Sequence, residues 1–211
     1  MFLKSENRIL RLIYENPEIR LNELIKRARV SVATAKKILD YLLDFNIIIE
    51  KKIMGKKKAL LKNFYPNLSS EEGKNVFSLI ESDKKREFFK RNKNLIGPFN
   101  QLLRNIDEKV KVILVFGSFA TNSQTKDSDL DVLFLINKKI NQNVLKKEIE
   151  RSFVTFNYEV SPRIDTLINF KENIKKGIYQ TIVRDCIIIK GISYYIDLKK
   201  ERQEVTLQEK I

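Results

Sequence analysis

The sequence predicts an α+β protein with two domains. Residues 1–65 are expected to form helices and a short hairpin, and residues 110–211 a mixed β-sheet with helices on one face. In the first segment apolar residues recur three and four positions apart, the period of an amphipathic helix, whereas the second contains continuous apolar runs typical of buried strands. Residues 66–109 hold two more amphipathic stretches interrupted by Gly and Pro, and we expect them to link the domains and pack on the sheet. With 211 residues, 43% of them hydrophobic, the chain can build two cores.

The N-terminal segment predicts three helices followed by two strands. Ile9, Leu12 and Ile13 share one face of a helix over residues 5–15, which Asn16-Pro17 ends. A second short helix is expected over residues 21–28. Ser31 is a good N-cap for a third helix, whose inward positions are Val32, Ala35, Ile38, Leu39 and Leu42. The runs 47–53 and 58–62, joined by a Lys-rich turn at Gly55, predict a basic hairpin.

This order of elements resembles a winged helix-turn-helix over residues 5–63, and the charge pattern suggests DNA as the partner. Residues 1–65 carry 15 Lys and Arg against 7 Asp and Glu, which is more than half of the net charge of +14. The third helix would enter the major groove and the hairpin would contact phosphates. The predicted DNA-binding residues are Ser31, Thr34, Lys36, Lys37, Lys56 and Lys57. Binding to a protein remains the alternative, because the third helix lacks Arg, Gln or Asn for reading base edges.

Residues 113–133 carry the strongest functional signal. An apolar run ends in Gly117-Ser118, ten residues follow, and Asp129 and Asp131 then open a second apolar run. Two carboxylates two positions apart on a strand point to the same face, with Cα atoms roughly 6.6 Å apart. Such a pair can hold two divalent cations, which phosphoryl-transfer sites place about 3.5–4 Å apart. Backbone N–H groups at Gly117 and Ser118 can hold a phosphate, so the pattern predicts nucleoside triphosphate chemistry with magnesium.

The same residues resemble the signature of the DNA polymerase beta-type nucleotidyltransferases, in particular the minimal (MNT) group. That signature is Gly-Ser, ten residues and Asp-x-Asp, and Gly117, Ser118, Asp129 and Asp131 match it position for position. One departure is Thr121-Asn122, where the family usually has a basic residue and Gly. Asn tolerates the left-handed backbone that Gly would supply, so the turn is expected to survive without a basic phosphate contact.

The resemblance implies a third carboxylate on a later strand. The segment 153–165 is rich in β-branched and aromatic residues and reads as that strand. Glu159 aligns best with the family position. Asp165, which follows Pro162, is the alternative, and a site with no third ligand also remains open. An amphipathic helix over residues 143–153 is expected before this strand, and a helix over 170–184 and a strand over 186–189 after it.

Composition argues against His-dependent chemistry and against a membrane location. The sequence contains no His, which excludes His-assisted catalysis and makes an imidazole-bound zinc implausible. The single Cys186 lies in an apolar run, where a buried thiol is expected. No apolar run approaches the roughly 18–20 residues that span a membrane. We therefore expect a cytoplasmic protein with no membrane partner.

The resemblance implies an enzyme that transfers a nucleoside monophosphate, with ATP as substrate and two Mg²⁺ ions as cofactors. Asp129, Asp131 and Glu159 would be the catalytic and metal-binding residues, and Gly117 and Ser118 would bind the triphosphate. Minimal family members often transfer AMP to a partner HEPN ribonuclease toxin, so a protein adenylyltransferase acting as an antitoxin is the leading expectation. Two alternatives stay open. One is an RNA or small-molecule nucleotidyltransferase. The other is a DNA-binding transcriptional regulator with a degenerate nucleotidyltransferase domain as sensor.

Overall fold

The structure is a computed structural model that describes residues 3–54, 60–137, 141–174 and 176–208. The chain forms two compact units, Met1–Ile80 and Glu81–Ile211. The predicted linker contributes to both, because Phe77 and Ile80 are buried in the first unit whereas Phe88 and Phe99 belong to the main core of the second. Within the described part of the chain, no helix is long and apolar enough to cross a membrane.

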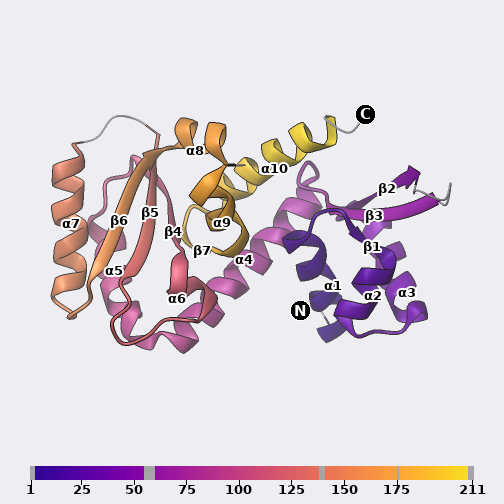
Figure 1. Cartoon of the computed structure of the whole chain (residues 1–211), viewed down its shortest axis with the longest axis horizontal. Coiled ribbons are helices and arrows are strands. Elements are labelled where there is room, and N and C mark those ends of the chain that lie inside the picture. Colours follow the sequence, from indigo (N-terminus) through magenta and orange to yellow (C-terminus); the bar gives the residue numbers. More distant parts are fainter. Residues whose placement is uncertain (1–2, 55–59, 138–140, 175, 209–211) are drawn as a thin grey trace. The chain divides into compact units, whose positions relative to one another are not determined.

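The first unit contains the three predicted helices and the two predicted strands. A short additional strand pairs with the hairpin, giving the antiparallel order β1-β3-β2 (Figure 1). The Ser31 hydroxyl accepts a hydrogen bond from the Thr34 N–H at 3.0 Å and so caps the third helix as predicted. The elements are α1 (Lys4–Glu15), β1 (Ile19–Arg20), α2 (Leu21–Ala28), α3 (Val32–Asp44), β2 (Ile48–Met54) and β3 (Leu60–Pro66).

The second unit is built on a mixed four-stranded sheet in the order β6-β5-β4-β7 (Figure 1). β4 runs antiparallel to both β5 and β7, whereas β6 is parallel to β5 and is reached through a crossover helix, α7. The strands are β4 (Val110–Val115), β5 (Leu130–Ile136), β6 (Val160–Thr166) and β7 (Ile187–Lys190). The helices are α4 (Glu71–Arg91), which begins in the first unit, η1 (Lys93–Leu95), α5 (Ile96–Asn105), α6 (Gly117–Thr121), α7 (Gln142–Val154), α8 (Leu167–Asn173), α9 (Gly177–Asp185) and α10 (Ile192–Gln208).

Helices cover both faces of this sheet, so the prediction of helices on one face was wrong. Side chains of α4, α5 and α7, among them Phe88, Phe99 and Phe153, pack on one face. Side chains of α8, α9 and α10, among them Phe170, Ile182 and Tyr195, pack on the other. The physical reason lies in β4 and β5 themselves. Successive residues from Val132 to Ile136 are all buried, and strands buried on both faces need a layer of helices on each side.

Candidate functional site

The site forms where β4 ends and β5 begins. β4 leads into the short helix α6 at Gly117, and a polar loop over residues 122–129 returns the chain to β5. The Phe116 N–H donates to the Asp131 carbonyl oxygen at 3.1 Å. This hydrogen bond brings the Gly117-Ser118 turn against the start of β5, so the two halves of the predicted motif meet in space.

The carboxylates of Asp129 and Asp131 lie close enough for their charges to interact. Asp129 is exposed just before β5, and Asp131 is partly buried as the second residue of the strand. Burial raises the pKa of Asp131, the charge of Asp129 raises it further, and Arg163 acts in the opposite direction. Within the described residues neither carboxylate has a hydrogen-bond or ion-pair partner. The site thus holds two adjacent carboxylates whose charge Arg163 offsets only in part, an arrangement that favours a bound cation.

Gly117 makes room for the Asp131 carboxylate. Its backbone is left-handed, with φ of 68°, and a Cβ built at this position would overlap the carboxyl group of Asp131. Only glycine meets both conditions without strain. The glycine of the predicted motif is therefore required by its contact with the aspartate of the same motif.

The departure at Thr121-Asn122 keeps the turn. Asn122 ends α6 in the left-handed conformation, with φ of 59°, as the sequence predicted for an Asn in place of Gly. The Thr121 hydroxyl lies 3.2 Å from the Gly117 carbonyl oxygen and 2.9 Å from the Ser123 hydroxyl. Thr121 thus stabilises the turn but brings no positive charge to it.

The loop that ends at Asp129 is anchored to the C-terminal end of α4. The Gln124 side-chain amide donates to Asn92 Oδ1 at 3.2 Å, and Asn92 in turn donates to the Phe88 carbonyl oxygen at 3.0 Å. Within the loop, the Ser128 hydroxyl accepts from the Thr125 N–H at 2.9 Å. These hydrogen bonds hold the loop that precedes Asp129 against the end of α4, a helix whose Phe88 is buried in the core.

The predicted third carboxylate, Glu159, lies directly before β6. Its carbonyl oxygen accepts the Leu130 N–H at 3.0 Å, so its backbone is beside that of the Asp pair, and its side chain is exposed. Among residues 3–54, 60–137, 141–174 and 176–208, no group of three or more Asp, Glu, Cys or His is close enough to hold a metal ion. The structure therefore presents two clustered carboxylates, and Glu159 stays a prediction as the third ligand.

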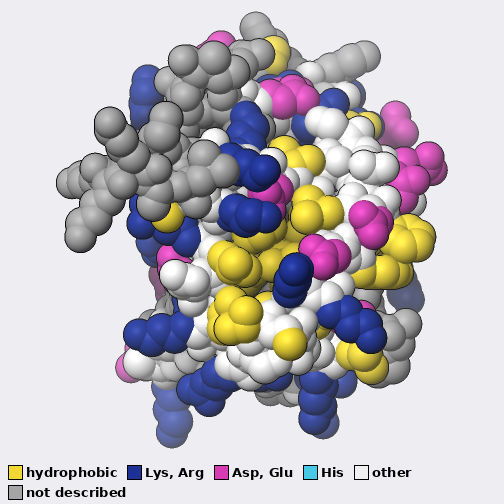
Figure 2. Space-filling view, turned by 90° about the vertical axis from the view of Figure 1, so that its right-hand side faces the viewer, with side chains coloured by type: hydrophobic (Ala, Val, Ile, Leu, Met, Phe, Trp, Pro, Cys, Tyr) yellow, Lys and Arg dark blue, Asp and Glu magenta, His cyan; other side chains and the backbone are white. Residues whose placement is uncertain are grey.

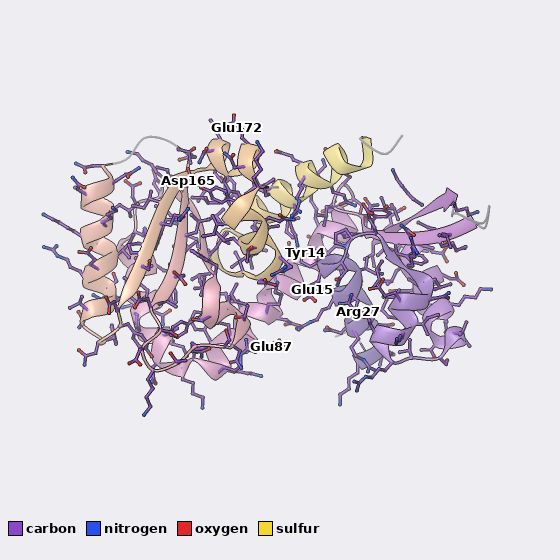
Figure 3. The ribbon with its side chains drawn as sticks, viewed as in Figure 1. Tyr14, Glu15, Arg27, Glu87, Asp165 and Glu172 are labelled. Carbon is purple, nitrogen blue, oxygen red and sulfur yellow. The ribbon has the colours of Figure 1, made fainter. Side chains whose placement is uncertain are left out.

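Asp165, the alternative, belongs to a different part of β6. Asp131 pairs with Ser161, and Asp165 lies four residues further on, roughly 13 Å along the strand. Figure 3 shows it at the end of β6 that leads into α8. Its carboxylate accepts hydrogen bonds from the Thr166 N–H at 2.7 Å, from the Asn169 amide at 2.8 Å and from the Tyr179 hydroxyl. This carboxylate is already satisfied by the protein.

Arg163 is a residue of the site that the sequence prediction missed. It alternates with Pro162 and Ile164 on β6, so its side chain leaves the same face of the sheet as those of Ser161 and Asp131. It is close enough to Asp131 to act on the pKa of that carboxyl. It also donates a hydrogen bond to the Tyr179 hydroxyl, which in turn donates to Asp165. The alternation along residues 159–165 was the one available signal. This alternation shows which residues share a face of β6, but only the register of β6 against β5 shows which of them lies near Asp131.

The predicted DNA-binding residues lie on the first unit. Ser31, Thr34, Lys36 and Lys37 are exposed on α3, and the hydroxyls of Ser31 and Thr34 are 2.8 Å apart. Lys56 and Lys57 lie outside the described residues. Figure 2 shows that Lys and Arg side chains and hydrophobic side chains both reach the surface on this side of the molecule. DNA binding and the winged-helix assignment stay predictions.

Comparison with known proteins finds a family similarity within the second unit. Residues 100–195 match the family described as "Polymerase beta, Nucleotidyltransferase". This part of the chain, a little under half of it, is therefore similar to a nucleotidyltransferase domain. The match begins within α5 and ends within α10, so it includes the whole sheet, Gly117, Asp129 and Asp131. No curated protein matches the chain.

One solved structure is similar to about half of this chain. It is described as "Crystal structure of the toxin-antitoxin with AMP-PNP", and it aligns with a TM-score of 0.37 at 16% sequence identity. The alignment covers 54% of this chain and 90% of that chain.

Proposed function

We propose that the protein is a magnesium-dependent nucleotidyltransferase that transfers AMP from ATP to a hydroxyl group of a partner protein. The observation that carries the proposal is the meeting of Gly117 with the Asp131 carboxylate, within a domain that matches the nucleotidyltransferase family. It supports a site in which the glycine turn and the Asp pair act on one ligand. The acceptor follows from the resemblance to the minimal nucleotidyltransferases.

The residues fit magnesium. Carboxylates such as Asp129 and Asp131 are hard oxygen ligands, and burial together with the charge of Asp129 raises the pKa of Asp131, as expected for a carboxylate that a cation would stabilise. Asp129 and Asp131 would hold the metal, together with Glu159 if it is the third ligand. When bound, magnesium would neutralise charge on the triphosphate and lower the pKa of the attacking hydroxyl.

The protein's own groups would bind and orient the triphosphate. The first N–H groups of α6, from Gly117 and Ser118, have no acceptor within the helix and can donate to phosphate oxygens, as can the Ser118 hydroxyl. Arg163 brings a positive charge to the face that carries Asp131, whereas Thr121 stands where the family usually has a basic residue. Its bond to Tyr179, in turn held by Asp165, restricts the guanidinium to a few orientations.

In the proposed reaction an oxygen of the acceptor hydroxyl forms a bond to the α-phosphorus of ATP. The bond from that phosphorus to the bridging oxygen of the β-phosphate breaks, AMP is transferred and pyrophosphate leaves. The hydroxyl proton passes to a carboxylate at the site, for which Glu159 is the proposed residue. Arg163 and the Gly117-Ser118 amides would stabilise the charge that develops on the phosphates.

A partner protein of the HEPN toxin type is the proposed acceptor, with the first unit binding DNA as a regulator of the same pair of genes. The excess of Lys and Arg in residues 1–65 supports the DNA-binding part. With such an acceptor, the protein would be an antitoxin that inactivates its partner toxin by adenylylation.

A direct test incubates the protein with ATP labelled at the α-phosphate, magnesium, the protein encoded by the neighbouring gene, and RNA. Label on the neighbouring protein supports the proposal, whereas label on RNA or on small molecules would transfer the assignment to those acceptors. Glu159→Gln tests the third carboxylate, with Glu150→Gln, an exposed residue of α7, as its matched control. Loss of labelling only in the first variant is expected.

A second candidate function is a DNA-binding regulator whose degenerate nucleotidyltransferase domain senses a nucleotide. It is favoured by one observation, that only two carboxylates cluster among the described residues. Magnesium-dependent binding of ATP without any transfer of label would support this function and overturn the enzymatic proposal.

A further inference from the structure

The second unit carries a basic groove outside the nucleotide site. The groove has a volume of about 500 Å³ and is formed by one face of α4 together with η1 and the start of α5. Its lining positions on α4 recur three and four residues apart, which places them on a single face of that helix, and Lys93 of η1 extends the lining beyond the end of α4. The residues that the argument uses are Lys85, Arg86, Phe89, Lys90, Lys93 and Ile96.

The charges of the groove differ in how far the protein compensates them. Arg86 pairs with Asp83 at 2.9 Å, and Lys85 donates to the Ile189 carbonyl oxygen at 2.6 Å, where burial lowers its pKa. Lys90 and Lys93 are exposed, and neither has a hydrogen-bond or ion-pair partner in the part of the chain that the structure describes. The rim thus offers two ammonium groups that are available to an anion.

The floor of the groove is apolar. Phe89 is half-buried and packs edge-to-face against Phe88 and Phe99, with ring centroids 5.2 and 5.8 Å apart. Ile96 is a large apolar side chain left 42% exposed beside it. Because the Phe89 ring is already engaged by two aromatic neighbours, the floor suits an aliphatic side chain better than a stacked nucleic-acid base.

We propose that this groove binds an acidic segment of the acceptor protein, which places an aliphatic side chain on Phe89 and Ile96 and carboxylates beside Lys90 and Lys93. The complementary charge and the apolar floor argue for such a peptide. The position of the groove favours the acceptor protein as the source of this segment, because the groove lies near the proposed site. Asn92, between the two lysines, accepts a hydrogen bond from Gln124 of the loop that ends at Asp129. The inference rests on the proposed function in one respect, that the partner is the protein that receives AMP.

The test measures binding to the full chain without nucleotide or magnesium, so that it is independent of transfer. The probes are a fluorescent short peptide of Asp, Glu and Ser with one central Leu, the same peptide with Ser in place of Leu, and a fluorescent oligouridylate. We expect the Leu peptide to bind about tenfold more tightly than the Ser peptide, because an aliphatic side chain is buried. Affinity should fall as salt is raised.

Two charge-reversal variants locate the site. Lys90→Glu with Lys93→Glu should weaken binding of the Leu peptide about tenfold, since two attractions become repulsions. The matched control is Lys146→Glu with Lys147→Glu, two exposed lysines of α7 in the same unit, and it should change binding less than twofold. Ile96→Ser should remove the preference for Leu while leaving the salt dependence. Circular dichroism confirms that each variant is folded, and Lys90→Gln with Lys93→Gln replaces the reversal if that variant unfolds.

Several results would overturn the inference: equal losses in the two charge-reversal variants, no preference for the Leu peptide, no binding, or oligouridylate binding more tightly than the peptide through the same lysines. Because the probes need no catalysis, peptide binding without transfer of AMP would reject the proposed reaction but keep the groove. Transfer that is unaffected by the groove variants, without peptide binding, would reject the groove alone.

Discussion

Two carboxylates on the same face of adjacent strands, Asp131 and Asp165, have opposite surroundings. Asp165 accepts hydrogen bonds from a backbone N–H, an amide and a tyrosine hydroxyl. Asp131 has no such partner within the described residues, lies beside Asp129, and has a raised pKa. A carboxylate in a binding site often lacks hydrogen-bond partners within the protein, because the ligand supplies them. A structural carboxylate instead receives its hydrogen bonds from the protein itself. From this comparison we expect Asp131 to contact the ligand and Asp165 to stabilise the fold.

Asp131→Asn should have the largest effect. Removing the partly buried charge takes away a metal ligand, and we expect labelling of the acceptor to fall at least about a thousandfold, or about 4 kcal/mol of transition-state stabilisation. The same variant should melt at a higher temperature than the wild type in the absence of divalent cations, because an uncompensated charge is gone. Asp127→Asn, in the same loop and exposed, is the matched control and should change neither measurement. A fully active Asp131→Asn enzyme would contradict the comparison.

Gly117→Ala should lower transfer by about a hundredfold, because the added methyl group overlaps the Asp131 carboxylate and the left-handed backbone is strained by roughly 1–2 kcal/mol. Gly177→Ala separates the two causes. Gly177 is also left-handed, with φ of 51°, but a Cβ there meets nothing within 4 Å. That control should lose stability and retain transfer. Equal loss of transfer in both variants would show that the contact with Asp131 does not matter.

Arg163→Gln should reduce kcat/KM for ATP about tenfold, mainly through KM, because a charged contact to the triphosphate is lost. Tyr179→Phe should give a smaller loss of the same kind, since it removes the bond that restrains the guanidinium but keeps the charge. Kinetics at varied ATP concentration measure both. If Tyr179→Phe were the more damaging of the two, Arg163 would not be the group that acts on ATP.

Asp165→Asn tests the other half of the comparison. It should lower the free energy of unfolding by about 1–3 kcal/mol, because donors that now meet a carboxylate lose part of their hydrogen bonding. Transfer should fall less than about tenfold, through the link to Arg163. Chemical denaturation and labelling give the two quantities. A thousandfold loss of transfer at unchanged stability would instead make Asp165 the third metal ligand.

Substitution of Cys186 should have the smallest effect on transfer. Its thiol is buried on the sheet face covered by α8, α9 and α10, and its partner is another protein group. Burial raises the pKa of the thiol to about 11, and the Sγ lies 3.2 Å from the Tyr195 hydroxyl. The folded protein should therefore react slowly with iodoacetamide at neutral pH. Because the folded pKa exceeds the unfolded one, the contribution of this group to stability is present below about pH 9 and is lost as the pH rises through about 11. Cys186→Ala should remove that loss without changing transfer.

The sequence determined the local features of the protein. Apolar spacing located most helices and strands, and Ser31 predicted the start of α3. The spacing did not predict α10, and it predicted one helix over residues 170–184 where the structure has α8 and α9. The Gly-Ser and Asp-x-Asp parts of the motif lie close together in the structure because they flank one short loop. The left-handed Asn122 followed from the side chain alone. Each of these depends on residues close together in the chain, where backbone sterics and capping decide the outcome.

Only the tertiary structure decided which distant groups share the site. The register of β6 against β5, reached through α7, places Arg163 near Asp131 and sets Asp165 apart from it, and a shift of one residue would turn every side chain of β6 to the other face. The covering of both sheet faces likewise combines distant helices: α4 and α5 on one face precede the sheet in the chain, whereas α8, α9 and α10 on the other follow β6. Register and layer order are fixed by packing between segments far apart in sequence, and this information is present in no single stretch of the chain.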